Sequence, residues 1–186
     1  MASIALDPAY RRVSVREFLA MDLGDAKAEL VDGLILMMAG GSPRHAGIAA
    51  NLTIALGNKL RGSGCRPYGS DLAVRTGEGS IRFPDVSVYC RDQHDPEPAD
   101  PKLLGIPRLV FEVLSPSTAS NDQITKLAEY LALPGLEGVV FVDPDTERMR
   151  VVTAGERDAG WLPAGSELDL PMLGLRLTSD EVFSDA

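Results

Sequence analysis

Two acidic residues lie in apolar, extended stretches of the sequence, and a lysine follows the second of them. Glu112 interrupts the apolar run 109–114, and Asp85 lies within the extended stretch 81–89. A buried carboxylate is costly unless it is paired or binds a metal ion. Two carboxylates on strands of one sheet can bind Mg²⁺ or Mn²⁺, which prefer oxygen ligands. Lys126 could then orient water or stabilise charge on a phosphate.

Each acid also has a purely structural explanation. Glu112 could pair with a basic residue of the sheet, and Asp85 could cap a strand. A buried acid with a perturbed pKa is often, but not always, part of a functional site. The residues alone therefore leave both interpretations open.

Hydrophobic periodicity and turn signals place these residues in an α/β (α+β) fold. Asp32-Gly33 predicts a hairpin between strands 28–32 and 34–39. Ser42-Pro43 predicts the start of a helix. Further along the chain the pattern predicts a central buried strand at 109–114, a helix at about 121–133, and strands at 138–142 and 148–153.

The helix at about 121–133 determines where Lys126 points. Its predicted apolar face consists of Ile124, Leu127, Ala128 and Leu131. Lys126 then lies beside this face, at the boundary between core and solvent. From there its side chain could deliver the ammonium to a cleft, or it could lie on the surface.

Bulk properties restrict the class of protein. The net charge of −9 argues against a protein that coats nucleic acid without specificity, because phosphate binding needs Lys and Arg. An enzyme that meets phosphate through a bound cation is compatible with this charge. No apolar run has the length of a membrane span, and the N-terminus lacks a secretory signal. Cys65 and Cys90 have no zinc-binding spacing, so reduced thiols and a cytoplasmic location are expected.

Several short motifs, in order, resemble the Uma2 family of the restriction-endonuclease-like PD-(D/E)xK superfamily. They extend over about residues 28–153. The motifs are Glu29-Leu30-Val31-Asp32-Gly33, Ser42-Pro43-Arg44-His45, Phe83-Pro84-Asp85-Val86, Glu112-Val113-Leu114-Ser115-Pro116-Ser117-Thr118, Asp122 with Lys126, and Val142-Asp143-Pro144.

The resemblance implies a restriction-endonuclease-like core, with a mixed central sheet flanked by helices. It implies that Asp85, Glu112 and the Val113 carbonyl bind the metal ion and that Glu29 joins the acidic cluster. The superfamily signature has a lysine two residues after the second acid, where this chain has Leu114. Lys126 replaces it, as is usual in the Uma2 pattern.

We expect a single domain over residues 1–186, with a β-rich C-terminal tail at 155–186. The predicted function is that of a Mg²⁺- or Mn²⁺-dependent endonuclease that hydrolyses DNA and forms a homodimer. His45 is a possible accessory residue, and Asp122 could pair with Lys126 one helical turn away. Two alternatives remain: a degenerate nuclease fold that binds nucleic acid or a partner without cutting, and a phosphoesterase acting on other substrates.

Overall fold

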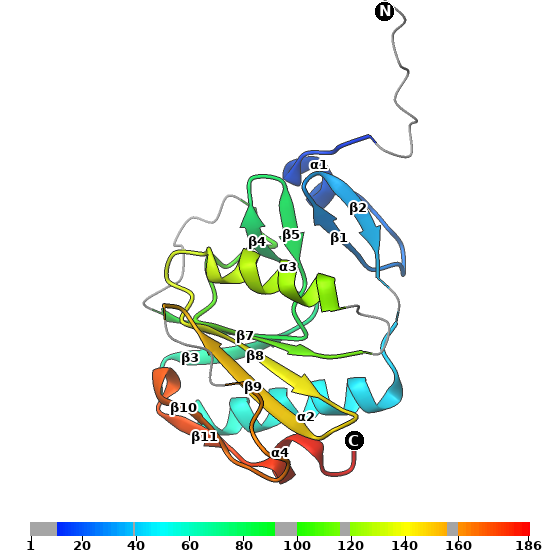
Figure 1. Ribbon diagram of the computed structural model, residues 1–186. Helices are drawn as coiled ribbons and strands as arrows, with labels where there is room; N and C mark the ends of the chain where they lie inside the picture. Colours follow the sequence, from blue (N-terminus) through cyan, green and yellow to red (C-terminus); the bar gives the residue numbers. More distant parts are fainter. Residues whose placement is uncertain (1–10, 39, 92–99, 116–119, 156–159) are drawn as a thin grey trace, which may run out of the picture.

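The computed structural model describes residues 11–38, 40–91, 100–115, 120–155 and 160–186 (Figure 1). Its helices are α1 (Val15–Ala20), α2 (Pro43–Lys59), α3 (Ser120–Leu131), the 3-10 turn η3 (Pro171–Leu173) and α4 (Ser179–Phe183). Its strands are β1 (Ala28–Val31), β2 (Leu34–Met37), β3 (Cys65–Gly69), β4 (Val74–Gly77), β5 (Ser80–Arg82), β6 (Val86–Cys90), β7 (Leu109–Val113), β8 (Gly138–Asp143), β9 (Arg148–Thr153), β10 (Leu168–Leu170) and β11 (Leu175–Leu177).

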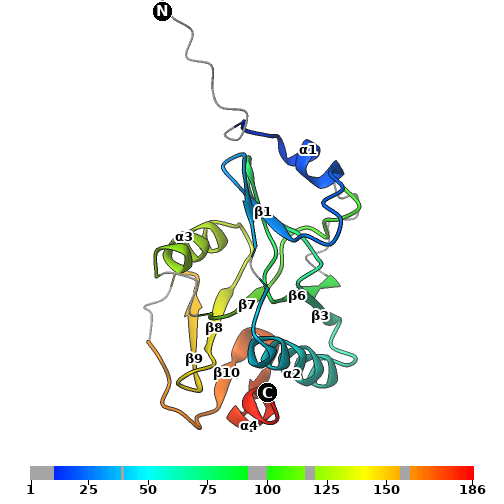
Figure 2. The same ribbon diagram turned by 90° about the vertical axis from the view of Figure 1, so that its right-hand side faces the viewer.

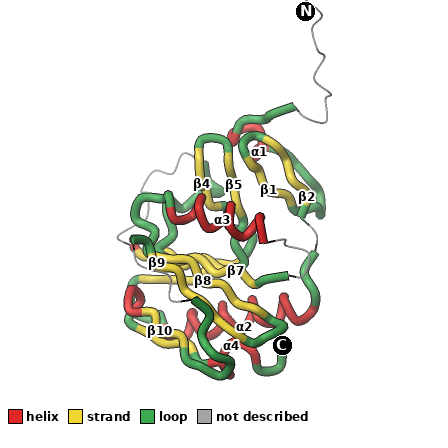
Figure 3. Tube along the Cα trace, viewed as in Figure 1, coloured by secondary structure: helices red, strands yellow, loops and turns green. Residues whose placement is uncertain are grey.

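A five-stranded mixed sheet forms the centre of the molecule. Its strand order is β3-β6-β7-β8-β9, in which only the β7–β8 pair is parallel. The views in Figures 2 and 3 show α2 on one face of this sheet and α3 on the other. All five residues of β7 are buried, because the strand has a neighbour on each side and a helix over each face. The predicted fold class and the central position of this strand are confirmed.

A second, antiparallel sheet of order β2-β1-β5-β4 lies above the central sheet in Figure 1, and its strand β4 contacts α3. The chain passes from this sheet to the central one between β5 and β6, at residues 83–85. The sequence stretch 81–89, expected to be extended throughout, is therefore divided into two strands. Pro84 lacks an N–H to donate to a ladder, and Asp85 follows it at the point where β6 begins.

The β1–β2 hairpin has the turn that the sequence predicts. Asp32 and Gly33 both have positive φ, at 48° and 82°, as a two-residue type I′ turn requires. The register pairs Val31 with Leu34 and Glu29 with Leu36. The hairpin thereby fixes the position of Glu29, whose side chain is buried.

Helix α2 begins and packs as its sequence predicts. The Ser42 side chain accepts a hydrogen bond from the His45 backbone N–H, and Pro43 occupies the first turn. Ile48, Leu52 and Leu56 are fully buried in the main core. The cap therefore holds His45 in the first turn of a helix whose apolar face is anchored to the sheet.

The predicted inner face of α3 is half right: Leu127 and Leu131 pack against the apolar cluster around Tyr130, but the other two residues do not face inward. Ile124 is 65% exposed and Ala128 is also exposed, whereas Lys126 and Tyr130 are buried. Hydrophobic periodicity assigns residues to a helix face by their polarity alone, so it predicted that the apolar Ile124 faces inward. The structure instead places on the inner side of α3 a lysine and a tyrosine that find polar partners there.

The C-terminal segment, for which the sequence predicts a β-rich tail over residues 155–186, contains both strands and a helix in its described part. Strands β10 and β11 form an antiparallel pair, but the tail ends in α4. That helix packs against α2, where Val182 and Phe183 are buried in the main core. None of the described helices is long and apolar enough to cross a membrane.

The two cysteines form a disulfide in the structure, whereas the sequence analysis expected reduced thiols. Residues Cys65 and Cys90 are 25 positions apart in the sequence. The antiparallel register of β3 and β6 makes them direct partners. Their pairing thus depends on strand register, which their spacing alone does not reveal.

Replacing Leu52 with alanine tests the contribution of α2 to the core. Leu52 is fully buried, so Leu52→Ala should lower the free energy of unfolding by about 2–5 kcal/mol, measured by urea denaturation. Ile54 on the same helix is 61% exposed, and Ile54→Ala should change it by less than ~0.5 kcal/mol. Equal losses in the two variants would contradict this orientation of α2.

Candidate active site

The structure brings five of the predicted site residues together between α3, the central sheet and β1. Asp85 precedes β6, Glu112 lies on β7, and Glu29 comes from β1 of the other sheet. Lys126 reaches them from α3, and His45 from the first turn of α2. The backbone of Val113, predicted to bind the metal ion, contacts Asp85, and the side chain of Asp122 lies outside the described residues.

Asp85 is held by two hydrogen-bonding groups. Its Oδ2 accepts a hydrogen bond from the Val113 backbone N–H at 2.7 Å and lies 3.3 Å from His45 Nε2. The pKa of His45 is raised, chiefly by its hydrogen bond to Asp85 and against the effect of burial; the Val113 backbone and the charge of Glu112 raise it further. His45 therefore touches two of the three groups predicted to bind a metal ion.

Glu112 is buried, and its carboxyl group interacts with two side chains of α3. Tyr130 Oη donates a hydrogen bond to Oε1 at 2.8 Å, and Lys126 Nζ lies 3.7 Å from Oε2. Burial raises the pKa of Glu112 to about 7, partly opposed by the charge of Lys126. The nearby negative charge of Asp85 raises it further. A carboxyl group in this state is poised to lose its proton when a cation arrives.

Lys126 is an interior residue, so the interpretation as a surface lysine is wrong. Only 9% of the residue is exposed. Its Nζ lies 3.1 Å from Glu29 Oε1, in addition to its approach to Glu112. The ammonium thus links acids from two different sheets.

Sequence reasoning missed Arg82, which is 1% exposed. Its Nη1 binds Glu29 Oε2 at 2.8 Å, and its Nε and Nη2 bind the two oxygens of Glu129 at 2.8 and 2.7 Å. Thr76 adds a hydrogen bond to Glu129. The two carboxylates raise the pKa of Arg82 against the effect of burial. This clamp fixes Glu29 and ties α3 to the second sheet.

Two signals for these missed residues exist in the sequence. Arg82 stands between the apolar Ile81 and Phe83, just before Pro84-Asp85. Glu129 and Tyr130 follow Lys126 at spacings of three and four, which place all three on one side of a helix. Neither signal names the partner, because Arg82 lies 53 and 47 positions from its two acids and Tyr130 lies 18 positions from Glu112.

The site holds more carboxyl groups than permanent cations. Glu29, Glu112 and Glu129 pair with Arg82 or Lys126, and Asp85 lies near Glu112. Four negative and two positive groups leave a charge of −2 when every carboxyl group is ionised and His45 is neutral. A divalent cation would neutralise this excess.

The donor chemistry fits a hard divalent cation that keeps open positions. Among the described residues, no group of three or more His, Cys, Asp or Glu side chains is arranged to hold a metal ion. Mg²⁺ is commonly held by only one or two carboxylates, with water and substrate phosphates completing its shell. Asp85 and Glu112, with the backbone of Val113 beside Asp85, could supply this set.

The fold is that of a nuclease-like protein. A crystal structure from Anabaena variabilis, described as "a putative nuclease belonging to DUF820", superposes with a TM-score of 0.78. At 18% sequence identity, the match covers 92% of this chain and 98% of the other.

The family model described as "Uma2: Putative restriction endonuclease" matches residues 15–179. The chain therefore belongs to the Uma2 family. The match begins at α1 and ends at α4, beyond both limits of the region 28–153 expected from the motifs.

Two uncharacterized proteins of Synechocystis sp. are similar to this chain. One is 32% identical over 183 residues, covering 94% of this chain and 93% of its own length. The other is 29% identical over 120 residues, covering 63% of this chain and 66% of its own length.

The raised pKa of Glu112 predicts a specific pH dependence of stability. The folded protein holds this proton more tightly than the unfolded chain, so Glu112 should lower stability as the pH rises from about 4.5 to 7. Without divalent metal, ionisation of Glu112 should lower the free energy of unfolding by about 2 kcal/mol between about pH 5 and 7.5, and Glu112→Gln should remove this decline. Urea denaturation of both proteins measures it. Parallel pH profiles would contradict the raised pKa.

Proposed function

We propose that the protein is a Mg²⁺- or Mn²⁺-dependent endonuclease that hydrolyses phosphodiester bonds in DNA. The main support is the cluster of Asp85, Glu112 and Lys126, which holds two carboxyl groups and one ammonium and in which Glu112 and Lys126 are buried. Membership in a family described as "Putative restriction endonuclease" supports the reaction class and DNA as the substrate.

Asp85 and Glu112, with the Val113 carbonyl, would hold the cation. When bound, a divalent ion polarises the phosphoryl oxygen and lowers the pKa of a bound water. Asp85 is oriented for this task by the Val113 backbone N–H. Glu112 would give up its proton on loading, while Tyr130 Oη keeps one of its oxygens in place.

Lys126 would orient the attacking water or stabilise negative charge on the phosphate. Glu29 holds its ammonium at 3.1 Å, and Arg82 holds Glu29 in turn. Both are therefore positioning residues for Lys126. Leu114, at the position where the superfamily signature has lysine, packs in the apolar cluster around Tyr130, so Lys126 supplies the cation that this position lacks.

Metal binding tests the roles of Asp85 and Glu112. Mn²⁺ should bind in a calorimetric titration and raise the melting temperature, because it binds the folded state alone. Asp85→Asn should abolish both effects, since it removes one of two anionic ligands. Asp71 is a matched control: it is exposed and pairs with Lys27 on the surface, so Asp71→Asn should leave Mn²⁺ binding unchanged.

The outcomes separate the proposal from its rivals. Unaltered Mn²⁺ affinity in Asp85→Asn would remove the metal site. Mn²⁺ binding without cleavage of DNA would indicate the degenerate nuclease fold. Hydrolysis of small phosphodiesters but not of DNA would indicate the phosphoesterase.

Replacing Lys126 tests its role in the reaction. Lys126→Ala should reduce DNA cleavage about 10²-fold or more, the scale for one preorganised charge-stabilising group. Mn²⁺ binding should persist, because the lysine is not a ligand. The rate of cleavage of a labelled duplex and a Mn²⁺ titration measure the two effects.

Lys27→Ala provides the control for Lys126→Ala. Lys27 is exposed and pairs with Asp71, so its replacement should leave the cleavage rate intact. A folded Lys126→Ala protein with full activity would refute the role of Lys126. Loss of Mn²⁺ binding in that variant would mean that Lys126 only maintains the structure of the site.

A further inference from the structure

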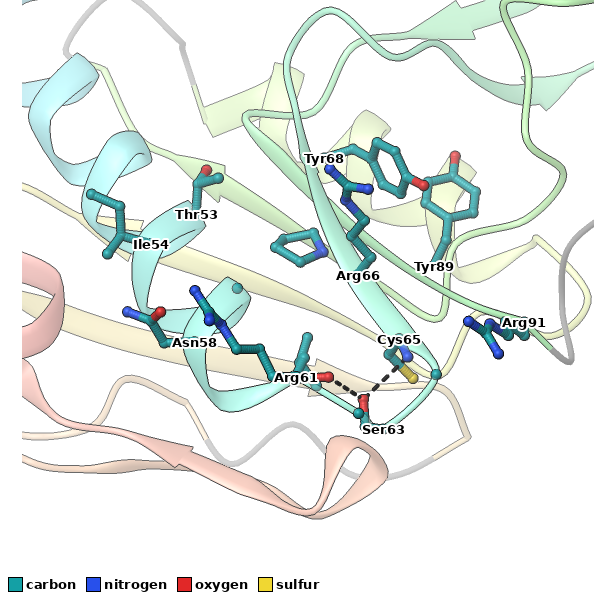
Figure 4. A pocket seen from close by; sticks show the side chains of 15 residues that line it. Thr53, Ile54, Asn58, Arg61, Ser63, Cys65, Arg66, Tyr68, Tyr89 and Arg91 are labelled. Carbon is teal, nitrogen blue, oxygen red and sulfur yellow. Dashed lines mark hydrogen bonds between the residues drawn. The ribbon is translucent and has the colours of Figure 1, made fainter.

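A large groove lies at the opposite end of α2 from the candidate active site. It has a volume of about 1120 Å³ and is lined by the second half of α2, the turn after it, β3 and the end of β6 (Figure 4). No Asp or Glu occurs among the described residues that line it, although the chain contains 27 acidic residues. The groove thus differs in charge from the rest of this acidic protein.

Three arginines from separate segments surround the groove. Arg61 follows α2, Arg66 lies on β3, and Arg91 follows β6 (Figure 4). All three are exposed, and none forms an ion pair with a carboxylate of the described residues. The Arg66 guanidinium lies 5.6 Å from the centroid of the Tyr68 ring, which restrains it over the groove. These guanidinium groups are available to an anionic ligand.

One continuous segment of the sequence, which forms most of the groove walls, contains no acidic residue. Residues 33–70 contain no Asp or Glu but four Lys or Arg residues. This segment forms α2 and β3, the two main walls of the groove. Arg44 and Lys59 of this segment pair with Glu147 and Glu181, so its positive charge at the groove comes from Arg61 and Arg66.

Helix α2 connects this surface to the candidate active site. His45 in its first turn contacts Asp85, whereas Asn58 near its end lines the groove. Thirteen residues at about 1.5 Å each separate them by about 20 Å. That distance corresponds to about six base pairs of duplex DNA. A ligand that reaches both places must be an extended polyanion.

We propose that the groove binds backbone phosphates of duplex DNA on one side of the bond that is cut. The proposal rests on the proposed function for its choice of substrate. Arginine is suited to this task, because its planar guanidinium can donate two parallel hydrogen bonds to a phosphate. Arg61, Arg66 and Arg91 are the phosphate-binding groups, and Asn58 and Thr53 add polar groups along α2.

Equilibrium binding to a fluorescein-labelled duplex of about 20 base pairs, in EDTA and over a range of salt concentrations, tests the groove without cleavage. The R61A/R66A/R91A protein should bind more than about tenfold more weakly than the unaltered chain at low salt. The slope of log K against log[salt] should become less steep by about 2–3, because fewer counterions are released.

A triple variant elsewhere on the surface controls for net charge. R11A/R16A/R176A removes the same three charges from exposed positions outside the groove. Its affinity and salt slope should stay close to those of the unaltered chain. A loss equal to that of the groove variant would overturn the proposal, since net charge alone would then explain both.

Three other results would also overturn the proposal. The first is unchanged DNA affinity in the groove variant, and the second is no binding of the duplex by the unaltered chain. The third is a change of oligomeric state in the groove variant with DNA affinity retained, which would identify the groove as an interface between two copies of the chain. Cleavage with Mn²⁺ is assayed separately, so binding without cleavage defeats the proposed function and leaves the groove supported.

Discussion

The site depends on the buried ion-pair network centred on Arg82 and Lys126. Arg82 bridges Glu29 of one sheet and Glu129 of α3, and Lys126 bridges Glu29 and Glu112 of the other sheet. Buried charges are tolerated only when each finds partners, and removing one partner typically costs about 3–5 kcal/mol. The network therefore fixes how the two sheets and α3 are placed relative to one another.

This constraint explains why the site forms where the chain changes sheets. Strand β5 ends with Arg82 in the second sheet, and after three intervening residues β6 begins in the central sheet. Asp85 thus lies at a junction whose other side is fixed by Arg82. Its Oδ2 accepts a hydrogen bond from the Val113 N–H, so one short segment aligns acids from both sheets.

The candidate active site and the arginine-lined groove differ in charge and therefore suit different ligands. The candidate active site has more negative than positive charge, which suits a divalent cation and repels a free phosphate. The arginine-lined groove at the other end of α2 has the opposite character. An extended anion would be attracted at one end of this helix and meet the carboxylates proposed to bind metal at the other. This separation would reconcile a net charge of −9 with the proposed polyanionic substrate.

The sequence alone determined the elements that depend on local chemistry. Asp32-Gly33 specified the β1–β2 turn, the apolar period of α2 specified its buried face, and a carboxylate in an apolar run marked Glu112. Only the tertiary structure decided which side of α3 faces inward, the partners of Arg82, and the pairing of Cys65 with Cys90. Turns and periodicity act over a few residues, whereas Arg82 meets acids 53 and 47 positions away. Ion pairs over such separations leave no local pattern, because they arise only when the packed sheets bring distant segments together.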